Sequence, residues 1–220
     1  MDDRDIGDRE GDVPEAGGAP LRSEDEPPAT PRPASTVILM RRGGKHVDRG
    51  IELLLGRRNP EARFMPGVWV FPGGSVDAAD GEGEAGFRAC AVRELEEEAS
   101  IRIDESELVA YSRWITPRVV PIRFDTKFYL ALAPAHTPPE PDGSEIVEAG
   151  WYPPPAALAM HHADQLPLVF PTIKHLESLL RFAGAEEAIE AARAREVVAV
   201  EPEIVGEGDD RRIVLPDELP

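Results

Sequence analysis

The stretch Arg93-Glu-Leu-Glu-Glu-Glu-Ala-Ser-Ile101 concentrates one arginine and four glutamates in six consecutive positions. On an α-helix, where successive residues turn by about 100°, Glu94, Glu97 and Glu98 stand at positions i, i+3 and i+4. Their carboxylates therefore lie on one arc of the helix, while the apolar residues of the stretch turn toward the core. The spacing predicts a helix over residues 84–100 that presents three converging carboxylates.

Three carboxylates within one helical turn repel one another by a few tenths of a kcal/mol per pair. A hard cation with a preference for oxygen ligands, Mg²⁺ or Mn²⁺, would turn this repulsion into binding. The alternative is a solvated acidic face, and Glu96, nearer the back of the helix, is expected to be such a solvated charge. The preceding Phe71-Pro-Gly-Gly74 favours the metal site, because glycine lets main-chain groups approach a cation or phosphate closely.

Apolar and β-branched runs on both sides of this helix predict a mixture of strands and further helices. Strands are expected over 35–40, 52–57, 68–71, 108–115, 124–132 and 148–152, and helices from 155, over 171–183 and over 185–195. The elements do not alternate as regular βαβ units, which predicts an α+β fold, an α/β/α sandwich with a mixed central sheet flanked by helices. We expect this domain, with a C-terminal helical extension, to occupy residues 35–220.

Acidic residues dominate the composition, with 42 Asp and Glu against 24 Lys and Arg and a formal net charge of −18. Ten of the acids lie in residues 1–34, which have few large apolar side chains and are expected to form a disordered acidic tail. The charge argues against a nucleic-acid polymer as a partner. No apolar run reaches the ~20 residues of a membrane span, and the acidic start does not resemble a signal peptide. The single Cys90 fits a reducing compartment, so a cytoplasmic location is expected.

Gly74 followed by Arg93-Glu94-Leu95-x-Glu97-Glu98 resembles the Nudix box, G-x5-E-x7-R-E-U-x-E-E-x-G-U, where U is a bulky aliphatic residue. The R-E-U-x-E-E core matches in full, and Ile101 fills the last U. Two departures stand out. Gly74 lies nineteen residues before Arg93 instead of fourteen, and Ser100 replaces the closing glycine. The longer spacing leaves Asp80 and Glu84 as alternative partners of Arg93.

A wider resemblance points to one branch of the Nudix family, which includes the mammalian peroxisomal coenzyme A diphosphatase and its bacterial relatives. It rests on residues 71–80, Trp114-Ile-Thr-Pro117, Arg123-Phe-Asp-Thr126 and a late Leu-Pro near Pro216. The resemblance implies metal-dependent cleavage of the diphosphate linkage of a nucleoside diphosphate conjugate, with coenzyme A or acyl-CoA favoured. Another conjugate (a nucleotide sugar or a dinucleotide) and a non-catalytic nucleotide sensor are the alternatives, although sensors usually lose box carboxylates that this chain keeps.

The resemblance also assigns roles within the site. Glu94, Glu97 and Glu98 would ligate Mg²⁺ or Mn²⁺, with the main-chain carbonyl of Gly74 as a further ligand. Arg93 would orient these carboxylates through an ion pair. Glu97 or Glu98 is alternatively the general base, so Glu97, Glu98 and Arg93 are the expected catalytic residues.

Several side chains outside the box are candidates for contact with the substrate. Arginines that could meet a phosphate precede it: Arg41, Arg42, Arg57, Arg58 and Arg63. We expect Arg57, Arg123 and Tyr129 to bind the substrate, with surface charge or a core position as the alternative for each. The expected partner is a small-molecule nucleotide diphosphate, with no nucleic-acid polymer and no membrane. The last two helices could form a homodimer interface as easily as a lid.

Overall fold

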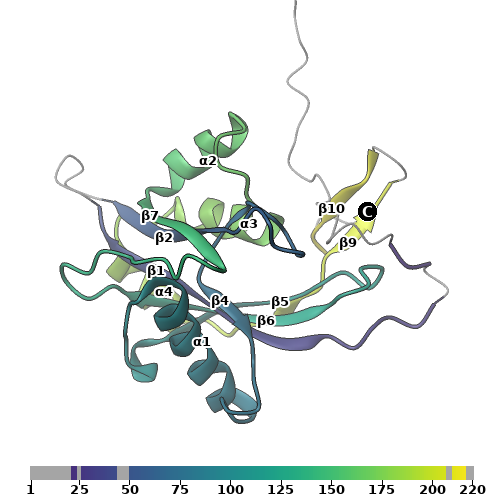
Figure 1. The fold of residues 1–220 in the computed structure, drawn as a ribbon, viewed down its shortest axis with the longest axis horizontal. Coiled ribbons are helices and arrows are strands. Elements are labelled where there is room, and N and C mark those ends of the chain that lie inside the picture. The colour runs from purple at the N-terminus through teal and green to yellow at the C-terminus, as the bar shows by residue number, and fades with distance from the viewer. Residues whose placement is uncertain (1–20, 24–25, 44–49, 207–209, 217–220) are drawn as a thin grey trace, which may run out of the picture.

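The computed structural model of this chain describes residues 21–23, 26–43, 50–206 and 210–216, and Figure 1 shows its arrangement. The centre is a mixed sheet of β1 (Arg32–Arg42), β2 (Ile51–Arg58), β3 (Trp69–Val70), β4 (Gly73–Ser75), β5 (Val109–Ile115), β6 (Phe124–Leu132), β7 (Ile146–Tyr152) and β8 (Ala199–Val200). The helices are α1 (Gly83–Ala99), α2 (Pro154–His162), α3 (Phe170–Leu179) and α4 (Ala185–Arg193), with a short 3₁₀ turn, η1, at Glu105–Glu107. A separate hairpin joins β9 (Glu203–Val205) and β10 (Arg212–Val214).

β1 is the central strand and pairs on both sides. It runs parallel to β6 along its length, and its other edge is antiparallel to β4 at 34–36 and to β2 at 40–42. The sheet order is β3-β2-β1-β6-β5-β8, with β4 added to β1 and β7 added to β2. The strand begins at Arg32, before the expected 35, because its first residues pair with β6 from Phe124 onward. Val37 to Met40 are fully buried, as expected for a strand covered on both faces.

The two faces of the sheet carry separate apolar cores. Val37 and Leu39 of β1 pack with Leu95 and other residues of α1, whereas Ile38 and Met40 pack with residues of α3 and α4. Alternate side chains of one strand therefore serve opposite faces. Figure 1 shows α1 on one side of the sheet and α2 and α3 on the other. The predicted α+β architecture, a mixed sheet between helices, is confirmed.

The structure adds detail to two expectations, the acidic tail over residues 1–34 and the helical extension at the C-terminus. Most of the acidic segment expected over 1–34 falls outside the described residues, and its last part lies against the sheet, where the Ala29 carbonyl accepts a hydrogen bond from Arg123 at 2.9 Å. The C-terminal part, expected to be a helical extension, contains the strands β8, β9 and β10 besides helices. Among the described residues, none of the helices has the length and apolarity needed to cross a membrane.

Candidate active site

A pocket of about 510 Å³ lies between α1, β4 and the end of β2. Its lining includes Glu94 and Glu97 of α1, Arg58, and Gly73–Ser75, the short strand β4, which we call the glycine loop. We call it the acidic pocket. Arg93, Glu94 and Glu97 of the box meet the glycine loop here.

The local sequence explains how α1 reaches this position. Cys90, Ala91, Leu95 and Ala99 form a buried stripe against the sheet, so the acidic arc turns toward the loop. The helix ends at Ser100, which adopts the left-handed conformation at φ 55° and donates its N–H to the Glu96 carbonyl at 2.9 Å. A non-glycine residue in this conformation costs about 1 kcal/mol. The structure thus keeps the usual helix end without the usual glycine.

The three box carboxylates approach the loop in different ways. Glu94 lies so close to Gly74 that a Cβ at Gly74 would overlap its carboxylate. Glu98 is only 4% exposed and accepts the N–H of Gly73 at 2.9 Å. The Glu97 side chain is 59% exposed, and it accepts a hydrogen bond from Arg93 at 2.8 Å. Burial raises the pKa of Glu98 to about 8 and also raises the pKa of Glu94.

Arg93 holds the acidic residues together. Its Nε and Nη2 donate to the two carboxylate oxygens of Asp80, each at 2.9 Å, and its Nη1 donates to Glu94 at 2.9 Å and to Glu97. Of the two partners left open by the sequence, Asp80 is therefore the one that pairs with Arg93. These hydrogen bonds lower the pKa of Asp80 and raise that of Arg93. Glu84 instead accepts from Lys127 and from Tyr129.

The oxygen atoms of the box carboxylates are suitable ligands for a divalent cation. Among the residues that the structure describes, however, no three His, Cys, Asp or Glu side chains are already grouped closely enough to hold one. Arg93 Nη1 bonds to both Glu94 and Glu97 in this arrangement. The candidate ligands are all oxygens, which is the choice of Mg²⁺ and Mn²⁺. The absence of a side chain at Gly74 leaves its backbone open to Glu94. Glu96, by contrast, is exposed and pairs with Arg102 at 2.5 Å, as expected for a solvated charge.

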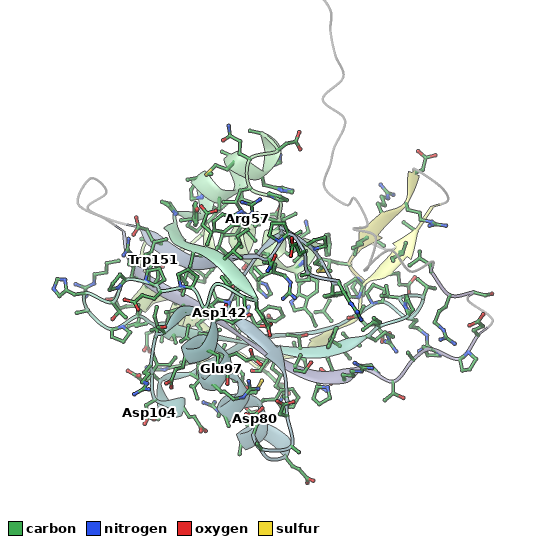
Figure 2. The ribbon with its side chains drawn as sticks, viewed as in Figure 1. Arg57, Asp80, Glu97, Asp104, Asp142 and Trp151 are labelled. Atoms are coloured by element: carbon green, nitrogen blue, oxygen red, sulfur yellow. The ribbon has the colours of Figure 1, made fainter. Side chains whose placement is uncertain are left out.

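Arg57 and Arg58 are neighbours on β2 and face opposite sides of the sheet. Arg57 lies on the side of Leu53 and Leu55, away from α1, with Nη1 3.7 Å from Glu148. Figure 2 shows Arg57 well apart from Glu97 and Asp80. Of the two, only Arg58 lines the acidic pocket, because strand alternation sends only every second side chain to one face. The contact of Arg57 with a substrate stays a prediction that this placement does not support.

The other two expected substrate residues take part in structural contacts instead. Arg123 is 5% exposed and donates to the carbonyls of Thr116 and Ala29, each at 2.9 Å, and to Glu201 at 2.6 Å. Tyr129 has no exposed surface, and its hydroxyl donates to Glu84 at 2.9 Å. Neither lines the acidic pocket, because burial against neighbouring elements already occupies their polar atoms.

Glu145 is a pocket residue that sequence reasoning missed. It lies in the turn before β7, where the Asp142 carboxylate accepts the N–H groups of Ser144, Glu145 and Ile146, each at 2.8 Å. Glu145 lines the acidic pocket, and its charge contributes to the raised pKa of Glu98. The Asp-Gly-Ser-Glu turn was visible in the sequence, but nothing local linked it to a helix more than forty residues earlier.

Comparison with known proteins agrees with this geometry. Residues 30–170 match the model of the NUDIX domain, well over half of the chain, and the chain therefore belongs to the NUDIX family. "Putative nudix hydrolase 7" of Caenorhabditis elegans is 28% identical over 183 residues, 67% of this chain and 60% of that protein. "NAD-capped RNA hydrolase NudC" of Pseudomonas aeruginosa is 27% identical over 161 residues, 72% of this chain and 49% of that protein.

A solved structure shows the same fold. The crystal structure of a NUDIX hydrolase from Alicyclobacillus acidocaldarius superposes with a TM-score of 0.65 and 26% identity, covering 74% of this chain and 96% of that one. The chain spans 60% of the length of the Caenorhabditis relative and 49% of the length of the Pseudomonas relative. Their activities are therefore a guide to the function proposed below.

Proposed function

We propose that this protein is a hydrolase that cleaves the diphosphate linkage of a nucleoside diphosphate conjugate with the help of Mg²⁺ or Mn²⁺. The observation that carries the proposal is the meeting of Glu94, Glu97 and Glu98 at the Gly73–Gly74 loop. Glu94, Glu97, Glu98 and the Gly74 carbonyl are the groups that would hold the cation. When bound, it would neutralise the diphosphate and lower the pKa of the attacking water.

The surrounding residues have distinct parts in this proposal. Arg93, fixed by Asp80, orients Glu94 and Glu97 as a positioning residue. Arg58, which lines the acidic pocket, would offer its guanidinium to a phosphate oxygen. Of the two candidate general bases, Glu97 is the better placed, because it lines the acidic pocket whereas Glu98 is almost completely buried.

The class of substrate follows from this chemistry and from the relatives. An acidic pocket binds an anion only when cations neutralise the negative charge, and a diphosphate is an anion that binds Mg²⁺ or Mn²⁺. The Pseudomonas relative is named for a substrate with an NAD cap. Coenzyme A or acyl-CoA is the particular conjugate that we propose to test first, with a nucleotide sugar and a dinucleotide as competitors. A small-molecule partner, a cytoplasmic location and a homodimer stay predictions.

The carboxylates can be tested with neighbouring glutamates of one helix. In a screen of diphosphate conjugates with Mg²⁺ or Mn²⁺, Glu97→Gln should lower kcat by at least about a hundredfold, since a positioned acid–base group contributes roughly 10²–10⁴-fold. Glu96→Gln, which alters the exposed pair with Arg102, is the matched control and should stay within about twofold of wild type.

The outcomes of this screen separate the alternatives. Half-products that appear only with metal, and not with Glu97→Gln, support the hydrolase. Equal values of kcat for Glu97→Gln and Glu96→Gln would show that Glu97 has no part in the mechanism. Tight nucleotide binding by the wild type without any cleavage would instead show a sensor.

A further inference from the structure

A second cavity, of about 260 Å³, adjoins the acidic pocket. The two share a border, formed by Thr36, Arg58, Phe64, Gly73, Phe124 and Thr126. Beyond this border the walls are mainly aromatic and aliphatic, with Phe71, Trp114, Phe128 and Phe170 among them. We call this cavity the apolar compartment. A group attached to a diphosphate in the acidic pocket would reach it directly.

The C-terminal hairpin closes one wall of the apolar compartment. Pro202, Ile204 and Ile213 line it, and all three lie beyond residue 170, where the match to the NUDIX domain ends. Ile204 and Ile213 are directly opposite each other in the β9–β10 pairing, so the two side chains form one apolar surface. Figure 1 shows the hairpin at the end of β5 and β6. The compartment is thus built partly by a segment outside the matched domain.

The hairpin is attached firmly enough to serve as a wall. Just before β9, Glu201 accepts a hydrogen bond from the buried Arg123 at 2.6 Å. Further back, β8 pairs parallel with β5 at Arg113 and Trp114. The same Trp114 lines the compartment. The segment that carries Ile204 and Ile213 is therefore held on the sheet at its base.

The chemistry of the walls indicates which group fits. Trp114 and Phe170 meet edge to face at 77°, and the rings of Phe64 and Phe124 are tilted by 57°, so neither pair forms a parallel slot for a nucleobase. The hydroxyl of Thr116 already accepts the N–H of Phe124 at 3.0 Å. A base would bury its polar edge here at a cost, whereas an alkyl group needs no hydrogen-bond partner.

We propose that the apolar compartment binds an uncharged aliphatic group of the conjugate, and that the hairpin, through Ile204 and Ile213, makes the protein selective for it. The proposal rests on the proposed function only in that it places the diphosphate in the acidic pocket. Arg58, which lines both cavities and donates to the Phe64 carbonyl at 3.2 Å, marks the boundary between charged and apolar parts of the ligand.

The test uses the full chain and the ethyl, hexyl and decyl esters of adenosine diphosphate. Binding is measured by calorimetry in Mg²⁺ with α,β-methylene analogues that cannot be cleaved, and turnover is measured separately with the ordinary esters. A fully buried methylene strengthens binding by about fourfold. Because the bound chain also loses rotational freedom, we expect the hexyl analogue to bind at least about tenfold more tightly than the ethyl analogue.

The variants assign this effect to the hairpin. Ile213→Asn should reduce the difference between hexyl and ethyl analogues to within about threefold, whereas its exposed neighbour Arg212→Asn should keep the full difference. Ile204→Ala is a milder second variant, useful if Ile213→Asn does not fold. It should lower the difference without abolishing it.

Each outcome bears on one proposal or the other. Equal affinity for all three chain lengths in the wild type, or an undiminished difference in both isoleucine variants, would overturn the proposed compartment. Cleavage of the ordinary esters without any dependence on chain length would overturn it while leaving the hydrolase intact. Binding that strengthens with chain length, but with no cleavage, would support the compartment and overturn the proposed hydrolase.

Discussion

Single side chains in this protein take opposite roles at adjacent positions. On β2, Arg58 lines the acidic pocket, while Arg57 lies across the sheet beside Glu148. On α1, Glu97 faces the pocket while Glu96 pairs with Arg102 at the surface. Residue type and sequence neighbourhood are nearly the same within each pair. The direction of the side chain is what separates a residue that lines the acidic pocket from one outside it.

The arginine pair yields a direct test. Arg58→Ala should lower kcat/KM by about ten- to a hundredfold, because a hydrogen bond to a charged group contributes about 1.5–3 kcal/mol. Arg57→Ala should change it by less than about twofold, since its contact with Glu148 is long and exposed. Steady-state kinetics on the best conjugate from the screen would measure both. A larger loss of kcat/KM with Arg57→Ala than with Arg58→Ala would show that Arg57 contacts the phosphate.

The helical carboxylates were predictable because the period of an α-helix depends only on nearby residues. The same reasoning could not choose between Arg57 and Arg58, since the face that a strand residue adopts depends on the register of the whole strand. It also could not place Glu145, which reaches the acidic pocket because the turn before β7 is hydrogen-bonded to Asn59 directly after β2.

At the scale of elements, the contact of β4 with β1 and α1 positions the site. Two successive glycines make this contact possible. A Cβ at Gly73 would overlap the main chain of β1 at Ser35 and Thr36, whereas the atoms nearest to one at Gly74 belong to the end of the Glu94 side chain. Gly73 therefore allows the strands to pair, and Gly74 leaves space for a carboxylate.

The two glycines should separate stability from activity. Gly73→Ala should lower the free energy of unfolding by about 1–3 kcal/mol, because the backbone of β1 must move to accept the methyl group. Gly74→Ala should leave this free energy nearly unchanged but lower turnover at least about tenfold, because Glu94 is displaced. Urea unfolding and metal-dependent kinetics measure the two effects. Equal losses of stability in both variants would contradict this division.

For the whole molecule, Arg123 connects three distant segments. It bonds to Ala29 near the start of the described chain, to Thr116 after β5 and to Glu201 before the hairpin. All of these partners accept hydrogen bonds, and the arginine among them is almost fully buried. These hydrogen bonds join the segments around Ala29 and Glu201 to the sheet.

Removal of this link should destabilise the entire fold. Arg123→Met should lower the free energy of unfolding by about 1–3 kcal/mol, because the carbonyls of Ala29 and Thr116 lose their donor and the partly exposed Glu201 loses its partner. Arg113→Met, which breaks a more exposed pair with Asp125, is the control and should cost about 1 kcal/mol or less. Urea titrations report both. Unchanged stability with a large increase in KM for Arg123→Met would instead support a substrate contact.

The sequence by itself determined the family, the mixed α+β architecture and the arc of three glutamates, because strand propensity and helical period are properties of short segments. Only the tertiary structure decided that Asp80 and not Glu84 pairs with Arg93, that Arg123 and Tyr129 are buried, and that a C-terminal hairpin walls the apolar compartment. These features depend on register and on contacts between segments far apart in the chain. Local sequence patterns carry no information about such contacts. These features can therefore be seen only in the assembled tertiary structure.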